Sequence, residues 1–208
     1  MICNWSASYC KTPMQSFLCY ALMFLYYHPN DVNNNIDPFN EAIRITNFSK
    51  SAKQFCLQHK YNDSIFFLID MSIHSGRKRF FVINMNNDSV IISGLVAHGA
   101  CGIFFSATAS FSNEPNYGCS SLGKYKVGKK YSGRFGSSYK LYGLDSTNSN
   151  AFKRNVILHS YYEIPDEEIY PAHVCHSLGC PMVSKNFLKS LSQIIDTSKK
   201  PILLWIVS

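Results

Sequence analysis

The chain has 208 residues and a formal net charge of +7, and 46% of its residues are hydrophobic while 16% are charged. This length and composition exclude a disordered chain and a coiled coil, and they allow one packed domain whose folding requires no disulfide scaffold. The 13 Tyr and 15 Phe favour a mainly β protein, because aromatic residues are enriched in strands.

Residues 1–36 are predicted to form an N-terminal extension that precedes a domain at 37–208. A single positive charge, Lys11, comes before an apolar run at 17–27 that has the length of a signal-peptide core and is too short to span a bilayer as a helix. We therefore expect export, with membrane contact only through this segment. The alternative is an amphipathic helix that packs on the domain. Residues 29–38 are rich in Asn, Asp and Pro and are predicted to be a linker.

The expected elements of the domain are mostly short strands. Apolar residues at helical spacing between Phe39 and Cys56 first predict a helix, or two short helices broken near 46–49. Strands are predicted at 65–70, 80–85, 90–96, 102–106, 122–127, 139–144, 156–159 and 202–207, and a second helix at 184–196. Gly, Ser and Asn clusters separate these strands. The predicted fold is therefore a β-sandwich of mixed sheets with a covering N-terminal helix and a short C-terminal helix.

Basic and aromatic residues alternate between residues 124 and 135. The basic members are Lys124, Lys126, Lys129, Lys130 and Arg134, with Tyr125, Tyr131 and Phe135 between them. Such a stripe can be the solvated face of a hairpin, a surface for an anionic cell-envelope polymer, or a surface for nucleic acid. We expect a solvated face first, an envelope polymer second and nucleic acid last.

Cys180 is the strongest candidate for a nucleophile. It lies in the segment Ser177-Leu178-Gly179-Cys180-Pro181. A glycine before the thiol allows a sharp turn that brings backbone N–H groups close to a substrate carbonyl. The flanking proline makes a place inside a buried strand improbable. A buried structural thiol is the alternative, since free cysteine is among the most buried residue types.

His159 is the candidate base. It ends the apolar strand Val156-Ile157-Leu158 and lies 21 residues before Cys180. A thiol with a pKa near 8.5 needs a base or an imidazolium neighbour to react at neutral pH. The pair therefore predicts acyl transfer through a thioester.

Histidines and cysteines near this segment also raise the question of a metal site. The residues concerned are His159, His173, Cys175, His176 and Cys180, and their spacing fits zinc poorly because neighbouring residues would have to share one tetrahedron. We therefore expect neither a metal nor a cofactor. The eight cysteines show no repeated spacing, so the sequence leaves their redox state open.

The candidate residues and their surroundings resemble the YkuD-type L,D-transpeptidase catalytic domain, in the branch with a Ser-x-Gly-Cys-Pro segment. The similarity runs from about Ile65 to the C-terminus. It includes Phe67-Leu68-Ile69-Asp70, Val96-Ala97-His98-Gly99, Phe111-Ser112-Asn113, Ser120-Ser121-Leu122-Gly123, Gly143-Leu144-Asp145, Arg154 and Ile157-Leu158-His159. The resemblance implies a β-sandwich, a bacterial periplasmic or cell-envelope protein, and peptidoglycan stem peptides as donor and acceptor, with no nucleic acid.

The resemblance also implies a role for each residue of the segment. Cys180 attacks the carbonyl that follows a meso-diaminopimelate-type residue, D-alanine leaves, and an amine of a neighbouring stem resolves the thioester into a cross-link. His159 transfers the protons, Ser177 orients the pair, and backbone amides around Gly179 and Cys180 hold the oxyanion. Water as the acceptor would make the protein an L,D-carboxypeptidase, and an unactivated thiol would make it a peptidoglycan-binding module.

Two positions depart from the family pattern. Leu178 stands where many members carry a second histidine, and His176 stands where this branch often carries arginine. A histidine can lose its charge near neutral pH, whereas arginine cannot, so His176 is a weaker candidate for holding a substrate carboxylate. Arg154 and His98 are the other candidate substrate-binding residues.

Overall fold

The computed structural model describes residues 38–103 and 106–208. The chain divides into two units, 1–40 and 41–208, and every described strand belongs to the second. The predicted signal-like run at 17–27 and all but the last residue of the predicted linker at 29–38 lie outside the described residues. The boundary expected between residues 36 and 37 stays a prediction.

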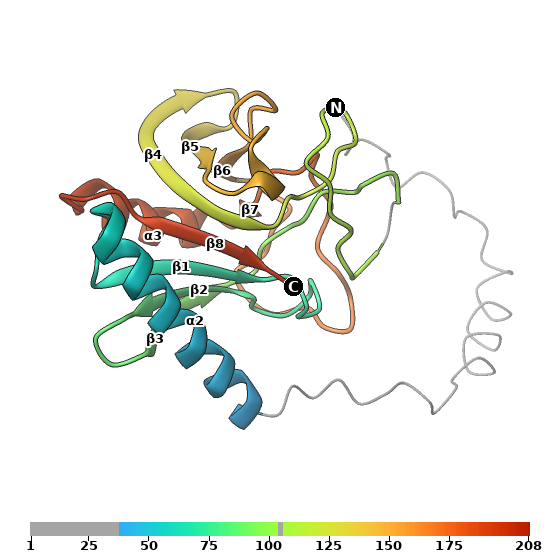
Figure 1. The fold of residues 1–208 in the computed structure, drawn as a ribbon. Helices are drawn as coiled ribbons and strands as arrows, with labels where there is room; N and C mark the ends of the chain where they lie inside the picture. The colour runs from blue at the N-terminus through green and yellow to red at the C-terminus, as the bar shows by residue number, and fades with distance from the viewer. Residues whose placement is uncertain (1–37, 104–105) are drawn as a thin grey trace, which may run out of the picture. The chain divides into compact units, whose positions relative to one another are not determined.

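Eight strands form one mixed sheet in the order β3-β2-β1-β8-β4-β5-β6-β7 (Figure 1). Their bounds are β1 (Ile65–Asp70), β2 (Phe80–Asn84), β3 (Ser89–Gly94), β4 (Gly123–Gly133), β5 (Gly136–Gly143), β6 (Ile157–Ser160), β7 (Met182–Val183) and β8 (Leu203–Val207). Strand β8 runs parallel to β1, and β7 runs parallel to β6, while the other neighbours are antiparallel. The mainly β prediction is confirmed. The two packed sheets of a sandwich are not shown, because all the described strands join one sheet.

Two helices cover opposite faces of the half of the sheet that contains β1 and β8. Helix α2 (Pro38–His59) is continuous, and Phe48 packs edge-on against Trp205 with ring centroids 5.3 Å apart. Helix α3 (Lys185–Thr197) packs into the main core beside Leu204, the neighbour of Trp205 on β8. Adjacent strand residues point to opposite faces, so the two contacts lie on different sides. No helix in the described part of the chain is long and apolar enough to cross a membrane.

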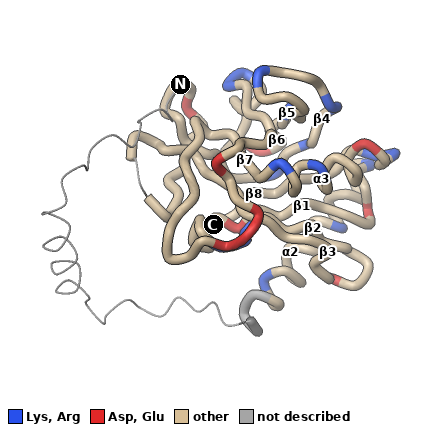
Figure 2. Tube along the Cα trace, turned by 180° about the vertical axis from the view of Figure 1, so that it is seen from behind, with Lys and Arg blue, Asp and Glu red and all other residues tan. Residues whose placement is uncertain are grey.

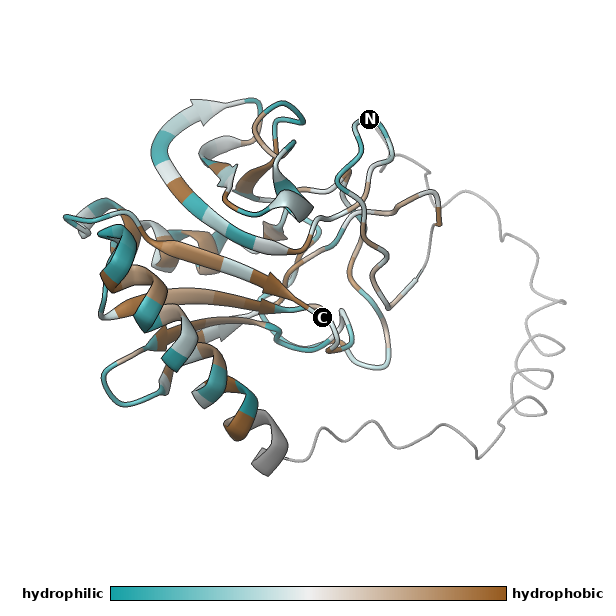
Figure 3. Ribbon diagram, viewed as in Figure 1, coloured by the Kyte–Doolittle hydropathy of each residue, from teal (hydrophilic) through white to brown (hydrophobic). Residues whose placement is uncertain are grey.

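The pattern of burial explains which strands the sequence reveals. Strands β1 and β8 are almost entirely hydrophobic in Figure 3, because a helix covers each face. Strand β4 alternates, with Tyr125 and Val127 buried and Lys124 and Lys126 partly exposed. A register shift between Val127 and Lys130 interrupts the β4–β5 ladder, and β4 curves strongly in Figure 1.

Two regions differ from the predicted strands. Of the segment predicted at 102–106, residues 104–105 lie outside the described residues, and the described part opens on a turn in which Cys101 and Gly102 both have positive φ, 52° and 77°. Strand β7 was not predicted, and its two residues directly follow Pro181. A strand of two residues is too short to show a hydrophobic period, so it is recognised only by its pairing with β6.

Candidate active site

Cys180 lies two residues before the start of β7, and its side chain is partly exposed. Its Sγ–H donates to the backbone oxygen of Asn155 across 3.8 Å. Burial raises the pKa of the Cys180 thiol, while a hydrogen bond from the Ile157 backbone and the charge of Arg154 oppose that rise. The resting group is therefore a protonated thiol, and it needs a base to become a nucleophile.

Gly179 forms the sharp turn in front of the nucleophile. Its φ is 109°, a conformation that side-chain-bearing residues rarely adopt. A Cβ at this position would lie 2.5 Å from the backbone oxygen of Cys119 and 2.9 Å from Nη2 of Arg154. The turn therefore requires glycine for two independent reasons, its backbone conformation and the close approach of its neighbours.

Ser177 holds this turn from within. Its Oγ accepts a hydrogen bond from the N–H of Gly179 at 3.0 Å, and its own N–H donates to the backbone oxygen of His98 at 2.9 Å. The N–H of Gly179 is thereby occupied. Within the described residues the N–H of Cys180 has no hydrogen-bond partner, so it is the donor of this turn that is available to a substrate oxygen.

His159 lies on β6 beside the nucleophile turn. It pairs with Met182, and its N–H faces the backbone oxygen of Pro181 at 3.5 Å, one residue after Cys180. Its ring Nδ1 lies 3.0 Å from the backbone oxygen of Ser160, which can only accept, so Nδ1 carries the hydrogen and Nε2 keeps its lone pair. Burial lowers the pKa of His159. The imidazole is therefore neutral at pH 7 and able to accept a proton.

Phe135 covers the His159 ring, a contact that the sequence did not reveal. The two rings are stacked, with centroids 4.2 Å apart and planes inclined by 22°. Phe135 lies between the ends of β4 and β5, and 40% of its surface is exposed. The flanking Gly133 and Gly136 indicate a hairpin turn, but only the pairing of Ser138 with His159 brings that turn to the base.

Arg154 is anchored by the protein itself. Its guanidinium donates to the backbone oxygen of Ser112 at 2.9 Å, to Oγ of Ser121 at 2.6 Å, and to the backbone oxygen of Cys119. Together these bonds attach the segment 112–121 beneath Gly179. The position favours support of the nucleophile turn over direct binding of a substrate carboxylate.

A disulfide joins Cys101 to Cys119, two cysteines 18 residues apart in the sequence. Cys119 is also the residue whose oxygen meets both Gly179 and Arg154. Among the described residues, Cys56 and Cys180 are free cysteines. The bridge therefore stabilises the segment against which the nucleophile turn rests.

His98 and His176 lie on the other side of the turn. His98 is 1% exposed, and its Nδ1 lies 2.8 Å from Nη2 of the buried Arg79. Burial, with the charge of Arg79, lowers the pKa of His98 to about 3. The ring of His176 stands 4.8 Å from that of His98, and its Nε2 donates to the backbone oxygen of Ser106 at 2.7 Å. Both side chains thus bind protein groups, and His98 has almost no surface for a substrate.

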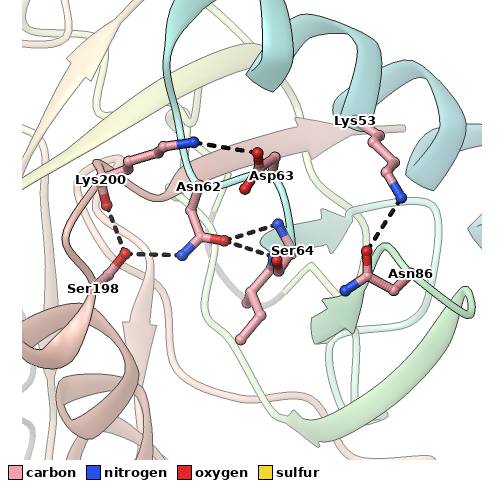
Figure 4. Close-up of polar contacts among 8 residues, drawn as sticks. Lys53, Asn62, Asp63, Ser64, Asn86, Ser198 and Lys200 are labelled. Atoms are coloured by element: carbon pink, nitrogen blue, oxygen red, sulfur yellow. Dashed lines mark hydrogen bonds and ion pairs between the residues drawn. The ribbon is translucent and has the colours of Figure 1, made fainter.

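In the described part of the chain, this site contains no metal cluster, and one surface depression lies among other residues. Among residues 38–103 and 106–208, no group of three or more His, Cys, Asp or Glu is placed to hold a metal ion. An open depression of about 410 Å³ is lined by the α2–β1 turn and the end of α3. Figure 4 shows these turns joined by Asn62 and Ser198, 2.9 Å apart, and by Asp63 and Lys200, 3.2 Å apart. None of the residues that line the depression belongs to the nucleophile turn.

Comparison with known proteins identifies the family. Residues 39–205 match the family described as the L,D-transpeptidase catalytic domain. A search of curated proteins found no match.

Similar solved structures include a mutant of the helical cell shape determining protein Pgp2 from Campylobacter jejuni. It is 13% identical over 76% of this chain and 55% of that one, with a TM-score of 0.46. An L,D-transpeptidase from Mycobacterium smegmatis is 10% identical over 70% of this chain and 59% of that one, with a TM-score of 0.42. For L,D-transpeptidase 1 from Mycobacterium tuberculosis, the corresponding values are 13%, 70%, 62% and 0.36.

The chain thus spans 55% to 62% of the length of these three structures. The family match covers most of the sequence. The chain therefore belongs to the L,D-transpeptidase catalytic domain family.

Proposed function

We propose that this protein is a cysteine-dependent murein L,D-transpeptidase that joins two peptidoglycan stem peptides through a thioester on Cys180. The observation that carries the proposal is the turn itself. A partly exposed thiol follows a positive-φ glycine and lies beside a strand that bears a neutral histidine. Membership of the family supports the same chemistry.

Acylation begins when Nε2 of His159 takes the proton of the Cys180 thiol. The sulfur bonds to the carbonyl carbon of the donor stem, and the carbonyl oxygen becomes an oxyanion. The N–H of Cys180, which has no hydrogen-bond partner among the described residues, supports that oxyanion, an arrangement whose loss typically costs about 10²-fold or more in rate. His159 then gives its proton to the nitrogen of the departing D-alanine, and the thioester remains.

Deacylation reverses the proton path. An amine of a second stem attacks the thioester carbonyl, His159 accepts a proton from that amine, and the bond to sulfur breaks. Cys180 recovers its proton, so the cycle consumes no cofactor. Water in place of the amine gives L,D-carboxypeptidase activity, which product analysis with and without an acceptor stem separates from cross-linking.

The remaining site residues act in this proposal by positioning. Ser177 stabilises the turn through Gly179, and Arg154 supports it through Cys119. The backbone oxygen of His98 accepts a hydrogen bond from the N–H of Ser177. The ring of His176 donates to the backbone oxygen of Ser106 and so anchors the loop that contains it. Burial lowers the pKa of His176, and its Nε2–H is bound to Ser106, so in this proposal the ring positions the loop and does not bind a substrate carboxylate.

An exported location in the periplasm or cell envelope accompanies the proposed activity. The disulfide between Cys101 and Cys119 supports it, since disulfides persist in oxidising compartments. The family's cell-wall substrates point the same way.

The decisive experiment is intact mass spectrometry after incubation with a tetrapeptide stem or a carbapenem. We expect one covalent adduct that maps to Cys180, and none in Cys180→Ala. Cys175→Ala is the matched control, because Cys175 is also a partly exposed cysteine of the same segment, and this variant should label at Cys180 as the natural protein does. Labelling at Cys180 no faster than that of a free peptide thiol would instead favour an inactive peptidoglycan-binding module.

A further inference from the structure

The β4–β5 hairpin is strongly basic and has no acidic residue. It holds 6 of the chain's 20 Lys and Arg residues, and between Gly123 and Gly143 there is neither Asp nor Glu. Lys and Arg appear in blue along these strands in Figure 2. Only Lys124 and Lys130 of this hairpin form ion pairs with described acidic residues, Asp145 and Asp196. The hairpin therefore carries a net positive charge that the described part of the chain compensates only in part.

An aromatic pair lies within this basic surface. The rings of Tyr142 and Phe152 are stacked, with centroids 5.1 Å apart and planes inclined by 14°. The ammonium of Lys126 stands 4.6 Å from the Tyr142 ring, and that of Lys140 stands 4.8 Å from the Phe152 ring. Phe152 is 51% exposed although it is a large apolar side chain. We refer to Lys126, Lys140, Tyr142 and Phe152 as the platform.

The platform adjoins the nucleophile through one tight turn. The N–H of Asn155 donates to the backbone oxygen of Phe152 at 3.0 Å, and the oxygen of Asn155 contacts the Cys180 sulfur. Arg154, which supports Gly179, lies between Phe152 and Asn155 in the sequence. Residues 152–155 therefore connect the platform to the contact with the thiol.

We propose that the platform binds a peptidoglycan strand outside the cleavage point, so that the protein holds the polymer and not only a single stem. The inference rests on the proposed function. Stem peptides carry free carboxylates that match the ammonium groups of Lys126 and Lys140. The apolar faces of sugar rings match the exposed aromatic surface of Phe152 and Tyr142. This combination fits a carboxylated glycan strand better than a purely anionic surface, which offers nothing to the rings.

The test is cosedimentation of the full chain with purified insoluble sacculi. Every protein carries Cys180→Ala, so that no covalent capture occurs. The platform variant is Lys126→Gln/Lys140→Gln, and the matched control is Lys185→Gln/Lys189→Gln, two exposed lysines of α3. Phe152→Ala tests the aromatic contribution separately, and thermal melting checks that each variant is folded.

We expect the platform variant to bind sacculi roughly fivefold more weakly at low salt, since each lost exposed ion pair contributes about 0.5 kcal/mol. The difference should shrink as salt is added. Phe152→Ala should weaken binding at all salt concentrations, and the α3 control should bind as the parent does.

Equal binding by the platform variant and the α3 control would overturn the inference. So would a loss confined to duplex DNA or to phosphatidylglycerol vesicles, used as parallel probes. Failure of the proposed function is read separately, from the absence of carbapenem labelling at Cys180 in the natural protein. The two failures are therefore distinguishable.

Discussion

The ring of Phe135 lies flat against the imidazole of His159, with centroids 4.2 Å apart. The turn between β4 and β5 thus covers one face of the candidate base, and His159 is 2% exposed. Burial of this kind lowers the pKa of His159. The tip of the hairpin therefore influences the proton affinity of a residue on another strand.

Replacing this cover should move the pH dependence of acylation. His159 must be neutral to accept the thiol proton, so the rate falls as the pH drops through its pKa, which lies below 6.5. Phe135→Ala admits water to the ring, the pKa rises toward 6.5, and the acidic limb shifts to higher pH. Carbapenem acylation rates between pH 4 and pH 8 measure the shift. Ser137→Ala, at an exposed position of the same hairpin, should leave the limb unchanged.

Gly179→Ala should abolish most of the activity. The new Cβ meets the oxygen of Cys119 and the guanidinium of Arg154, and the left-handed backbone adds about 1–2 kcal/mol of strain. A displaced sulfur should then acylate about 10²-fold more slowly. Gly102→Ala is the control, because Gly102 also has positive φ but its Cβ would meet nothing within 4 Å. It should lose stability without a comparable loss of rate, and equal losses in both variants would contradict the argument.

Reduction of the Cys101–Cys119 bridge should weaken the site as well as the fold. In the chain-entropy model a loop of this length contributes about 3 kcal/mol to stability. The Tm should therefore fall in dithiothreitol, and acylation at Cys180 should slow, because Cys119 supports the turn. Cys101→Ser/Cys119→Ser should reproduce both effects and no longer respond to the reductant. An unchanged Tm in the double variant would show that the bridge does not stabilise the fold.

The free energy of unfolding should fall more steeply with decreasing pH than the titration of the carboxylates alone predicts. His98 has a folded pKa of about 3, against an ordinary value of 6.5, because burial and Arg79 disfavour its charged form. The unfolded chain therefore binds the proton first. The stabilisation is complete above pH 6.5 and is lost as the pH falls from 6.5 toward 3. Urea unfolding at pH 7, 5 and 4 should show a smaller decline in His98→Asn, which removes this titration.

Much of the fold was predictable where local pattern and burial agree. The uninterrupted apolar run of β1 and the apolar stripe of α3 identify these elements within one residue of their bounds. Local pattern does not determine the sheet order, because β8 inserts between β1 and β4 only through long-range pairing. It also does not distinguish one sheet from two, since the same alternation serves both.

The same limit applies to the candidate site. The glycine turn at Gly179 and its neighbour Cys180 are visible as a local motif. The stacking of Phe135 on His159 depends on the register between β5 and β6. The pairing of Cys101 with Cys119 depends on the three-dimensional path of the chain between them. The spacing of these residues along the sequence predicts neither contact. The sequence predicted Arg154 as a substrate-binding residue, and that role stays a prediction. Its three protein acceptors are a tertiary property that no local pattern carries.

The central place of β8 has a consequence for the growing polypeptide. Phe66 pairs with Leu203, and Tyr125 pairs with Leu204, so one late segment bonds to two much earlier ones. Until Leu203–Val207 is available, the facing sides of β1 and β4 stay open, and unpaired strand edges are sites of aggregation. A nascent chain that lacks this segment would therefore depend on chaperones to stay soluble.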